Sequence, residues 1–410
     1  MNRLDAALNV PLDRRKLLAG AAAGIAAAPA IAQNSIDLGF PGGQSQFPLT
    51  SSFPGKGEMI LQRTTPPLLE TPMEVFDGDV FTPNDRFFVR WHWSGIPAAI
   101  DVDQFRLAVR GRVKQTLSIG LRELLAMPRV EIAAVNQCSG NSRGLFEPRV
   151  PGAQWGNGAM GNARWLGVRL RDVLDKAGLL TDAIAVRFTG LDTPVMPDAP
   201  HFKKTLTLDH ARSDEVMIAF GMNGEQLPLV NGFPIRLVVP GWYSTYWVKM
   251  LSDIEVLSAP DDNFWMAKAY KIPATPHASV APGAKDFPTV PIGPMVPRSF
   301  VTNLREGQRV AMAPTIAAGG IAMGGDSGVA KVELSTDGGK NWLPATLGRD
   351  HGRYSFRRWD ARVPVAGPGK LTILARCTND AGASQPLEPV WNPSGYMRAQ
   401  VEALTIEVAA

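Results

Sequence analysis

The sequence predicts an α+β fold that is richer in strands than in helices. Apolar runs typical of strands occur at residues 105–111, 131–137, 183–190, 215–224 and 233–241. Helical apolar spacing is confined to residues 118–127 and 168–179, and Gly178 gives the second segment a stop signal. The 40 glycines and 34 prolines among 410 residues indicate many turns. Because the strands follow at irregular intervals instead of alternating with helices, we do not expect a doubly wound sheet.

Changes in composition divide the chain into five expected parts. They are a leader (1–33), a Pro- and Gly-rich extended arm (34–80), a mixed α+β catalytic domain (81–275), a Pro-rich linker (276–299) and a β-sandwich (300–410). Short alternating strands and an Asp337-Gly338-Gly339 turn make the last part resemble an immunoglobulin-like sandwich. Such a domain more often serves dimerisation or interaction than catalysis.

The first 33 residues are expected to be removed from the mature protein. Arg14, Arg15 and Lys16 precede an apolar run at residues 17–32 that ends in Ala-Ile-Ala, as in a twin-arginine signal peptide. The run is rich in Ala and Gly and too short for a stable membrane span, although an uncleaved N-terminal anchor stays an alternative. This leader predicts export to a bacterial periplasm, with any cofactor inserted before transport.

The net charge and the cysteine content limit the classes of partner, crosslink and cofactor that we expect for this chain. The formal net charge is +4, and no clustered basic stripe of the kind that binds nucleic acid is present. With two cysteines in an exported chain, disulfides are not expected to stabilise the fold. Cys377 lies in the alternating segment LTILARCTND and is expected in the core of a strand. No CxxCH motif is present, so no c-type haem is attached to this chain.

Cys138 is the residue with the strongest chemical signal. It lies in AVNQCSGNSRG (134–144), with Arg143 five positions later and Arg90 and His92 upstream in FFVRWHWSGIP. A thiolate among cationic groups suits both a soft, high-valent metal and an oxyanion substrate. The alternative is a buried, inert cysteine, which is the commoner fate of an isolated thiol.

Several motifs occur in a fixed order along the chain. They are FTPNDRFFVRWH, NQCSGNSRG, WGNGAMGNARWLGVRLRDVL, MNGEQLPLVNGFPIRLVVPGW, VKML, DDNFWMAKAYKIP and WNPSGYMR. Together they resemble the sulfite oxidase family of molybdenum enzymes over nearly the whole mature length. The likeness is greatest to bacterial periplasmic sulfite dehydrogenases, which lack the fused haem domain of the animal enzymes.

The resemblance implies a molybdenum-molybdopterin cofactor with one protein thiolate on the metal, which by position is Cys138. Arg90 and Arg143 match substrate arginines, whose planar, forked donors suit a small oxyanion. Tyr270 matches an active-site tyrosine, and Lys268 lies close to it in AKAYKIP. The residues implied to bind the cofactor are Arg90, His92, Cys138, Asp192, Asn231, Arg236, Trp247, Val248 and Lys249.

Two positions depart from the animal enzymes. Asn231 stands where they have a pterin-contacting histidine, and its amide can still donate or accept. Ser394 stands where they have a further substrate arginine, which is expected to leave the oxyanion pocket one charge poorer. Arg398 is close in sequence, but its direction is not given by the sequence.

The resemblance implies oxidation of sulfite to sulfate, with electrons passed to a separate c-type cytochrome or haem-bearing subunit. The chain would pair with itself or with that subunit. Two alternatives stay open. One is a periplasmic molybdopterin reductase of the methionine-sulfoxide type, whose members lack the C-terminal sandwich; the other is a non-catalytic exported binding protein.

Overall fold

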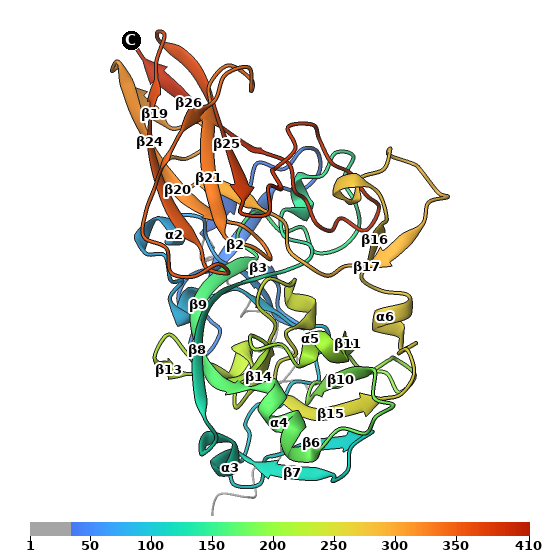
Figure 1. The fold of residues 1–410 in the computed structure, drawn as a ribbon. Helices are drawn as coiled ribbons and strands as arrows, with labels where there is room; N and C mark the ends of the chain where they lie inside the picture. The colour runs from blue at the N-terminus through green and yellow to red at the C-terminus, as the bar shows by residue number, and fades with distance from the viewer. Residues whose placement is uncertain (1–33) are drawn as a thin grey trace, which may run out of the picture.

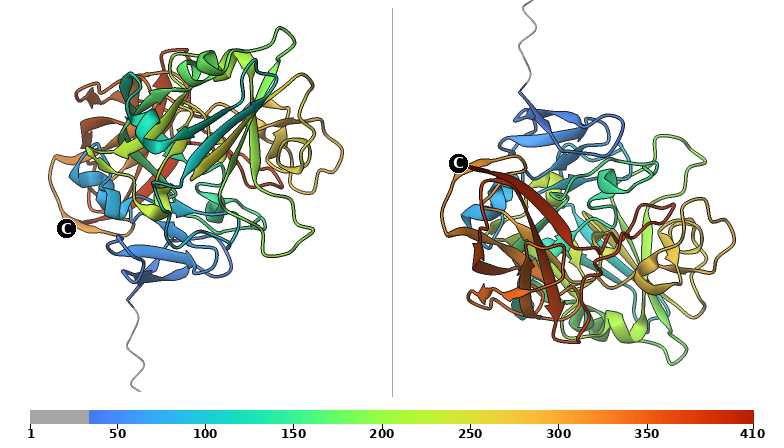
Figure 2. Two further views of the ribbon diagram at one scale, coloured as in Figure 1. Left: turned by 90° about the horizontal axis from the view of Figure 1, so that it is seen from below. Right: turned by 90° about the horizontal axis from the view of Figure 1, so that it is seen from above.

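The computed structural model describes residues 34–410, so the predicted leader at residues 1–33 lies outside the described residues. The N-terminal sheet has five strands in sequence order: β1 (Ser35–Asp37), β2 (Gln46–Thr50), β3 (Met59–Arg63), β4 (Leu68–Glu70) and β5 (Val89–Arg90). Figure 2 shows these strands, in blue, on an outer flank of the molecule. The segment expected to be an extended arm with few regular elements therefore forms most of a sheet, and β5 joins that sheet to the predicted catalytic domain.

Two further sheets, called the central sheets because they come from the middle of the chain, lie in the lower part of Figure 1. One has the order β11 (Lys203–Thr207), β10 (Ala185–Gly190), β15 (Leu251–Leu257), β6 (Arg106–Gly111) and β7 (Leu117–Gly120). The other has the order β13 (Glu225–Gln226), β12 (Met217–Met222), β9 (Met160–Arg169) and β8 (Arg129–Gln137), with β14 (Arg236–Val238) also paired to β12. Each predicted strand run overlaps one of these strands, whereas β7, β9, β11, β13 and β15 were not predicted as strands.

Helices are few and short. They are α2 (Val75–Gly78), α3 (Leu121–Leu125), α4 (Leu170–Ala177), α5 (Leu208–Ala211) and α6 (Phe264–Ala267), with 3-10 turns at η1 (Asn84–Arg86), η2 (Arg143–Leu145), η3 (Leu229–Asn231), η4 (Ser244–Tyr246) and η5 (Pro276–Ala278). Helix α4 buries Leu170, Val173 and Leu174 and ends at Gly178, whose φ of 67° is the left-handed conformation that glycine adopts at little cost. The helix expected at residues 118–127 begins only at Leu121, because residues 117–120 pair with β6 as strand β7.

The C-terminal part is built from two sheets (orange to red in Figure 1). One has the order β18 (Arg298–Val301), β20 (Thr315–Met323), β24 (Arg357–Pro364) and β23 (Thr346–Leu347). The other has the order β19 (Arg309–Ala311), β26 (Glu402–Ala409), β25 (Gly369–Asn379), β21 (Val329–Ser335) and β22 (Leu343–Pro344). The predicted turn at residues 337–339 links β21 and β22, with both glycines at positive φ. The immunoglobulin-like topology stays a prediction.

Two main hydrophobic cores hold the central and C-terminal sheets, and two small clusters lie at the N-terminal sheet. The larger core fills the central sheets and extends to Phe300, Ile321 and Met323 of the C-terminal part, while a smaller core lies between the two C-terminal sheets. Cys377 is fully buried on β25 in that smaller core, as predicted, and neither cysteine forms a disulfide. In residues 34–410 there is no helix of the length and apolar character needed to cross a membrane.

The predicted Pro-rich linker is packed against the catalytic domain. Strands β16 (Lys271–Pro273) and β17 (Thr289–Pro291) pair, and Ile292 and Met295 after them are buried in the larger core. Burial of these apolar side chains removes them from water and fixes the segment to the domain. The segment is therefore a structured connection between the two parts.

Candidate active site

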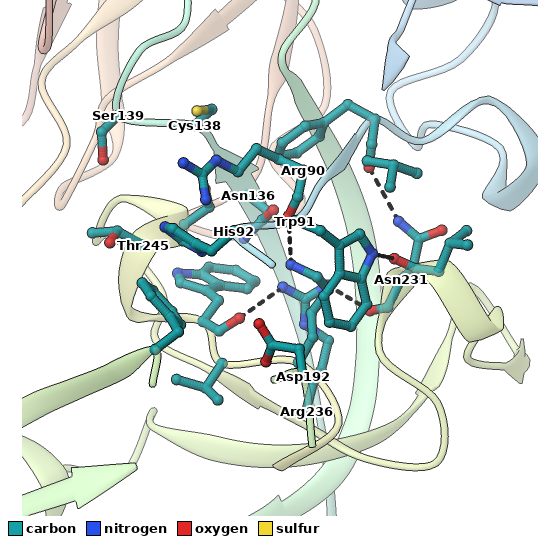
Figure 3. A pocket seen from close by; sticks show the side chains of 18 of the residues that line it. Arg90, Trp91, His92, Asn136, Cys138, Ser139, Asp192, Asn231, Arg236 and Thr245 are labelled. Atoms are coloured by element: carbon teal, nitrogen blue, oxygen red, sulfur yellow. Dashed lines mark hydrogen bonds between the residues drawn. The ribbon is translucent and has the colours of Figure 1, made fainter. Parts of the chain in front are cut away.

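An inner cavity and an outer cleft meet at Cys138. The inner cavity lies under β5 and the loops around β14, and the outer cleft, with a volume of about 720 Å³, opens beside it. Arg90, Cys138 and Tyr270 line both. These three residues come from three segments far apart in sequence, so folding brings the predicted thiolate, one predicted substrate arginine and the predicted tyrosine to one place. Figure 3 shows the first two, Cys138 and Arg90.

Strand β8 positions the thiol. The strand ends at Gln137, and the Cys138 amide donates to the Ala159 carbonyl at 2.9 Å, which continues the pairing with β9 by one residue. The chain then turns, since the Asn141 amide donates back to the Cys138 carbonyl at 3.0 Å. Cys138 is 7% exposed, so its sulfur sits at the boundary of the two spaces without being open to bulk water.

The two predicted substrate arginines differ in how they are held. Arg143 lines the outer cleft, where its guanidinium donates to the carbonyls of Ala153 and Ser394, both at 3.3 Å, and lies 5.0 Å from the Tyr396 ring centroid. Arg90 makes no side-chain hydrogen bond within residues 34–410, and its buried Nη1 atom has no partner. Figure 3 shows the guanidinium of Arg90 directed toward Cys138. A buried donor without a partner is costly unless a ligand satisfies it, so Arg90 is available for an anion.

Glycines make the space that Arg143 occupies. A Cβ atom at Gly140, Gly152 or Gly395 would lie 2.5–2.8 Å from the Arg143 side chain, closer than atoms can pack. Gly152 and Gly395 also have positive φ angles of 113° and 60°. The side chain of Arg143 is therefore enclosed by backbone from three different segments, which fixes its direction.

Tyr270 and His92 form a buried pair. The phenol oxygen lies 2.5 Å from His92 Nε2, and the Tyr270 ring stacks on Tyr396 with centroids 5.3 Å apart. Burial, followed by the charges of Arg90, Lys249 and Lys204, lowers the pKa of His92 well below its usual value, so the imidazole is neutral. Burial likewise raises the pKa of Tyr270, so the phenol keeps its proton. Tyr270 has a φ of 55°, an uncommon conformation for a bulky residue that is concentrated at functional sites.

The floor of the inner cavity carries charged groups. Arg236 donates to the carbonyls of Asn231 at 2.8 Å and Trp247 at 3.2 Å, and burial lowers its pKa to about 9. Lys249 donates to the Arg90 carbonyl at 2.7 Å, and burial, with the neighbouring charge of Arg236, lowers its pKa to about 7. Burial raises the pKa of Asp192, against the opposing effect of Lys249. With Arg90, the cavity thus combines three basic side chains with one acidic side chain.

Asn231 is held by residues of the segments that connect strands of the N-terminal sheet. Its Oδ1 atom accepts from Lys56 Nζ at 2.7 Å, and its Nδ2 atom donates to the Phe88 carbonyl at 3.1 Å. Lys56 also donates to the carbonyls of Asn84 and Phe87, both at 2.8 Å, and burial lowers its pKa to about 7. The position expected to replace a histidine is therefore oriented by a buried lysine that the motifs did not indicate.

The structure places the predicted residues in two groups. Every residue implied to bind the cofactor lines the inner cavity: Arg90, His92, Cys138, Asp192, Asn231, Arg236, Trp247, Val248 and Lys249. Lys268 and Ser394 line the outer cleft with Arg143, whereas Arg398 is turned to Glu402, with 2.5 Å between Nη1 and Oε1. Asn136, Ser139 and Thr245 also line the inner cavity, each with a buried polar atom that has no partner, and were missed. Asn136 and Ser139 flank Cys138 in its motif, which was the available signal.

Comparison with known proteins identifies relatives for both halves of the chain. Residues 93–265 match the model of the oxidoreductase molybdopterin binding domain, and residues 292–407 match that of the Mo-co oxidoreductase dimerisation domain. The chain is 34% identical to mitochondrial sulfite oxidase of Homo sapiens over 80% of its own length, spanning 62% of that relative. It is 33% identical to sulfite oxidase of Gallus gallus, again over 80% of its length, and covers 73% of that protein.

A solved structure has the same fold. The sulfane dehydrogenase SoxCD from Paracoccus pantotrophus superposes with a TM-score of 0.69 over 84% of this chain and 87% of that chain, at 23% identity.

The side chains of the inner cavity fit a molybdopterin group. Unpartnered buried donors are supplied by Arg90, Asn136, Arg236 and the hydroxyls of Ser139 and Thr245. Arg and Lys suit a phosphate, and a carboxylate such as that of Asp192 accepts from the N–H groups of a pterin ring.

Proposed function

Because this chain belongs to the sulfite oxidase family, we propose that it oxidises sulfite to sulfate at a molybdenum-molybdopterin centre held by Cys138. The overall reaction consumes sulfite and water and releases sulfate, two protons and two electrons. The electrons pass to an external c-type cytochrome or haem-bearing subunit. Bound at Cys138, the cofactor supplies the oxygen-transfer and redox chemistry that protein side chains lack.

One observation carries the proposal. Cys138 lies between a cavity lined with donors that suit a pterin phosphate and a cleft lined with cations that suit a small oxyanion. Arg90 and Tyr270 line both spaces with it, so a substrate in the cleft and a metal on the sulfur would meet the same two side chains. A structural cysteine has no need of this arrangement.

The arginines bind and orient the substrate. Arg90 offers a guanidinium with no protein partner in residues 34–410, and Arg143 offers one that two carbonyls and three glycines hold in place. Charge-assisted hydrogen bonds from such groups to an oxyanion are shorter and stronger than neutral ones. Ser394 contributes through its backbone, because its carbonyl holds Arg143 while its hydroxyl donates to the Lys271 carbonyl at 3.1 Å.

Tyr270 supplies a neutral donor at the substrate. The phenol stays protonated because burial raises its pKa, and His92 stays neutral because burial and nearby cations lower its pKa. When His92 donates from Nε2 to the phenol oxygen, the phenol hydrogen is free to donate to an oxyanion in the cleft. The pair thereby stabilises negative charge without adding another positive one.

The location and the partners follow from the leader and the C-terminal part. We infer that the twin-arginine leader at residues 1–33 directs the chain to the periplasm, where a c-type cytochrome accepts the electrons. The match to a dimerisation domain at residues 292–407 supports pairing through the C-terminal sheets, either with a second copy or with a haem-bearing subunit.

Metal analysis and a substrate screen test the proposal. The purified protein should contain about one molybdenum per chain and reduce cytochrome c only when sulfite is added. The screen would run sulfite beside methionine sulfoxide, with an artificial acceptor and an artificial donor in parallel. Turnover of methionine sulfoxide alone would overturn sulfite oxidation in favour of a reductase. Absence of molybdenum together with free alkylation of Cys138 would leave only a binding role.

A further inference from the structure

The outer cleft carries more positive charge than the predicted substrate arginines supply. Its lining includes six cationic side chains and neither Asp nor Glu: Arg63, Arg90, Arg143, Arg149, Lys268 and Lys271. Its volume of about 720 Å³ would hold many waters, at roughly 30 Å³ each, so a small anion fills only part of it. An anion therefore has a path through a positive region before it reaches Cys138.

The cations of the cleft differ in how far protein groups already satisfy them. The guanidinium of Arg149 already has protein partners, because it donates to Gln154 Oε1 at 2.8 and 3.1 Å and to the Gln44 carbonyl at 2.9 Å. Arg143 is held by carbonyls as described above. The side chain of Arg63, which is exposed, makes no hydrogen bond or ion pair with any residue of the described chain, 34–410. Its guanidinium is thus free to meet a ligand.

Strand register aims Arg63 at the same wall of the cleft as Arg90. Leu68 of β4 pairs with Arg63 of β3 on one side and with Arg90 of β5 on the other. Paired residues of antiparallel strands project to the same face, so the three side chains form one row across the sheet. All three line the cleft.

A β-bulge produces this register. The pairing shifts between Leu61 and Arg63, which leaves Gln62 as the extra residue of β3. In a regular strand Gln62 and Arg63 would point to opposite faces, yet both line the cleft. Bulges near active sites re-aim side chains in this way.

The charge of Arg90 acts on Arg63. Partial burial lowers the pKa of Arg63, and the positive charge of Arg90 lowers it further. Two like charges brought onto one face without an acid between them repel each other, and an anion placed between them removes that repulsion. The arrangement is unfavourable without a ligand and favourable with one.

We propose that Arg63 binds the anionic substrate in the outer cleft and delivers it to Arg90, so that the N-terminal sheet supplies a third substrate arginine. The identity of the anion as sulfite rests on the proposed function, whereas the anion site itself does not. The charge that Ser394 was expected to remove from the pocket is then supplied from the opposite end of the chain.

The test compares Arg63→Gln with Arg63→Lys and with Arg309→Gln in the molybdenum-loaded protein. Arg309 is an exposed arginine on β19 that does not line the cleft, so its variant has the same loss of charge. Arg63→Gln should raise KM for sulfite and the dissociation constant of sulfate about threefold to tenfold, with kcat nearly unchanged. Arg63→Lys should recover part of the loss, and Arg309→Gln should match the wild type.

Calorimetric binding of sulfate separates this proposal from the proposed reaction. Weaker sulfate binding in Arg63→Gln alone supports the site even if the wild type does not oxidise sulfite. Unchanged KM and sulfate affinity in Arg63→Gln would overturn it, as would an equal effect of Arg309→Gln. Unchanged circular dichroism and melting temperature exclude misfolding, which is not expected for an exposed side chain without hydrogen bonds or ion pairs in the described chain.

Discussion

The Tyr270 hydroxyl and His92 Nε2 lie 2.5 Å apart, although 178 residues separate them in sequence. Tyr270 lines both the inner cavity and the outer cleft. Its partner His92 stacks on Phe202, with ring centroids 3.6 Å apart. Because both groups are neutral and buried, neither attracts a counter-ion, and the phenol can be offered to an oxyanion.

Replacing Tyr270 with Phe should therefore slow turnover more than it weakens binding. Loss of a donor that serves a developing negative charge should lower kcat about 10- to 100-fold, with a smaller change in KM for sulfite. Steady-state kinetics would measure both constants. Tyr354→Phe is the control, because it removes a phenol whose hydroxyl donates to Glu215 at 2.5 Å, outside both cavities. A kcat within twofold of wild type in Tyr270→Phe would contradict the assigned role.

Cys138→Ser should abolish molybdenum retention and activity, because a serine hydroxyl is a harder and far less acidic donor than a thiol. Cys377→Ser should keep both, since the Cys377 sulfur only donates to the Met323 carbonyl at 3.5 Å, and a hydroxyl can do the same. Metal analysis and sulfite turnover would measure the difference.

Alkylation gives an independent measurement on the same two thiols. Iodoacetamide should modify Cys138 in molybdenum-free protein through the outer cleft and leave Cys377 unmodified, because burial raises the pKa of Cys377 and keeps it as a thiol. Molybdenum-loaded protein should resist modification. Equal labelling of Cys138 with and without the metal would argue against a metal–sulfur bond.

The buried amine of Lys56 predicts a pH dependence of stability. Its folded pKa of about 7 is below the unfolded value of 10.5, so between these values the unfolded chain binds more protons. The contribution of Lys56 to the free energy of unfolding must therefore rise with pH from about 7 to 10.5, by up to about 1.4 kcal/mol per pH unit. Below pH 7 both states are protonated and the dependence vanishes.

Lys56→Met should remove this slope and lower the melting temperature, because the buried acceptors around Lys56, which include Asn231 Oδ1, lose a donor. The free-energy difference from wild type should therefore widen between pH 7 and pH 9 in urea unfolding. Lys285→Met, which removes an exposed charge, is the control. A difference that stays constant over this range would show that Lys56 is not buried as a neutral amine.

Ser394→Arg should strengthen inhibition by sulfate. Ser394 lines the outer cleft, and an arginine there adds a cation to a wall that already contains Arg143. The inhibition constant of sulfate should fall about threefold to tenfold, and competitive inhibition assays would measure it. Ser258→Arg, which adds an arginine at an exposed position outside the cleft, should change nothing. Unchanged inhibition in Ser394→Arg would place that side chain away from the bound product.

The family resemblance, carried by motifs in a fixed order, predicted the parts of the site that lie in those motifs. The thiol after the strand that ends at Gln137 and the cationic residues of GFPIR and WVKML each belong to such a motif, and Cys138, Arg236 and Lys249 line the inner cavity. Alternation likewise predicted Cys377 in a strand core.

Long-range contacts account for what was missed. Lys56 reaches Asn231 across 175 residues, and Arg63 faces the cleft only because a bulge shifts its register against Leu68. Neither contact leaves a periodic pattern in the sequence. The apolar residues of β7 run directly into α3, so their spacing predicts a helix over residues 118–127, and only pairing with β6 makes residues 117–120 a strand.

The carbonyl of Ser394 and the ring of Tyr396 hold Arg143 from a loop between β25 and β26. The boundary suggested by the two family matches therefore does not separate a self-sufficient enzyme from a detachable appendage. A chimera that joined this catalytic domain to the C-terminal half of a relative would import a foreign loop into the substrate cleft. We expect recombination at that boundary, in the laboratory or in evolution, to keep activity only when two parts come from the same parent protein. These parts are the loop and the glycines that enclose the Arg143 side chain.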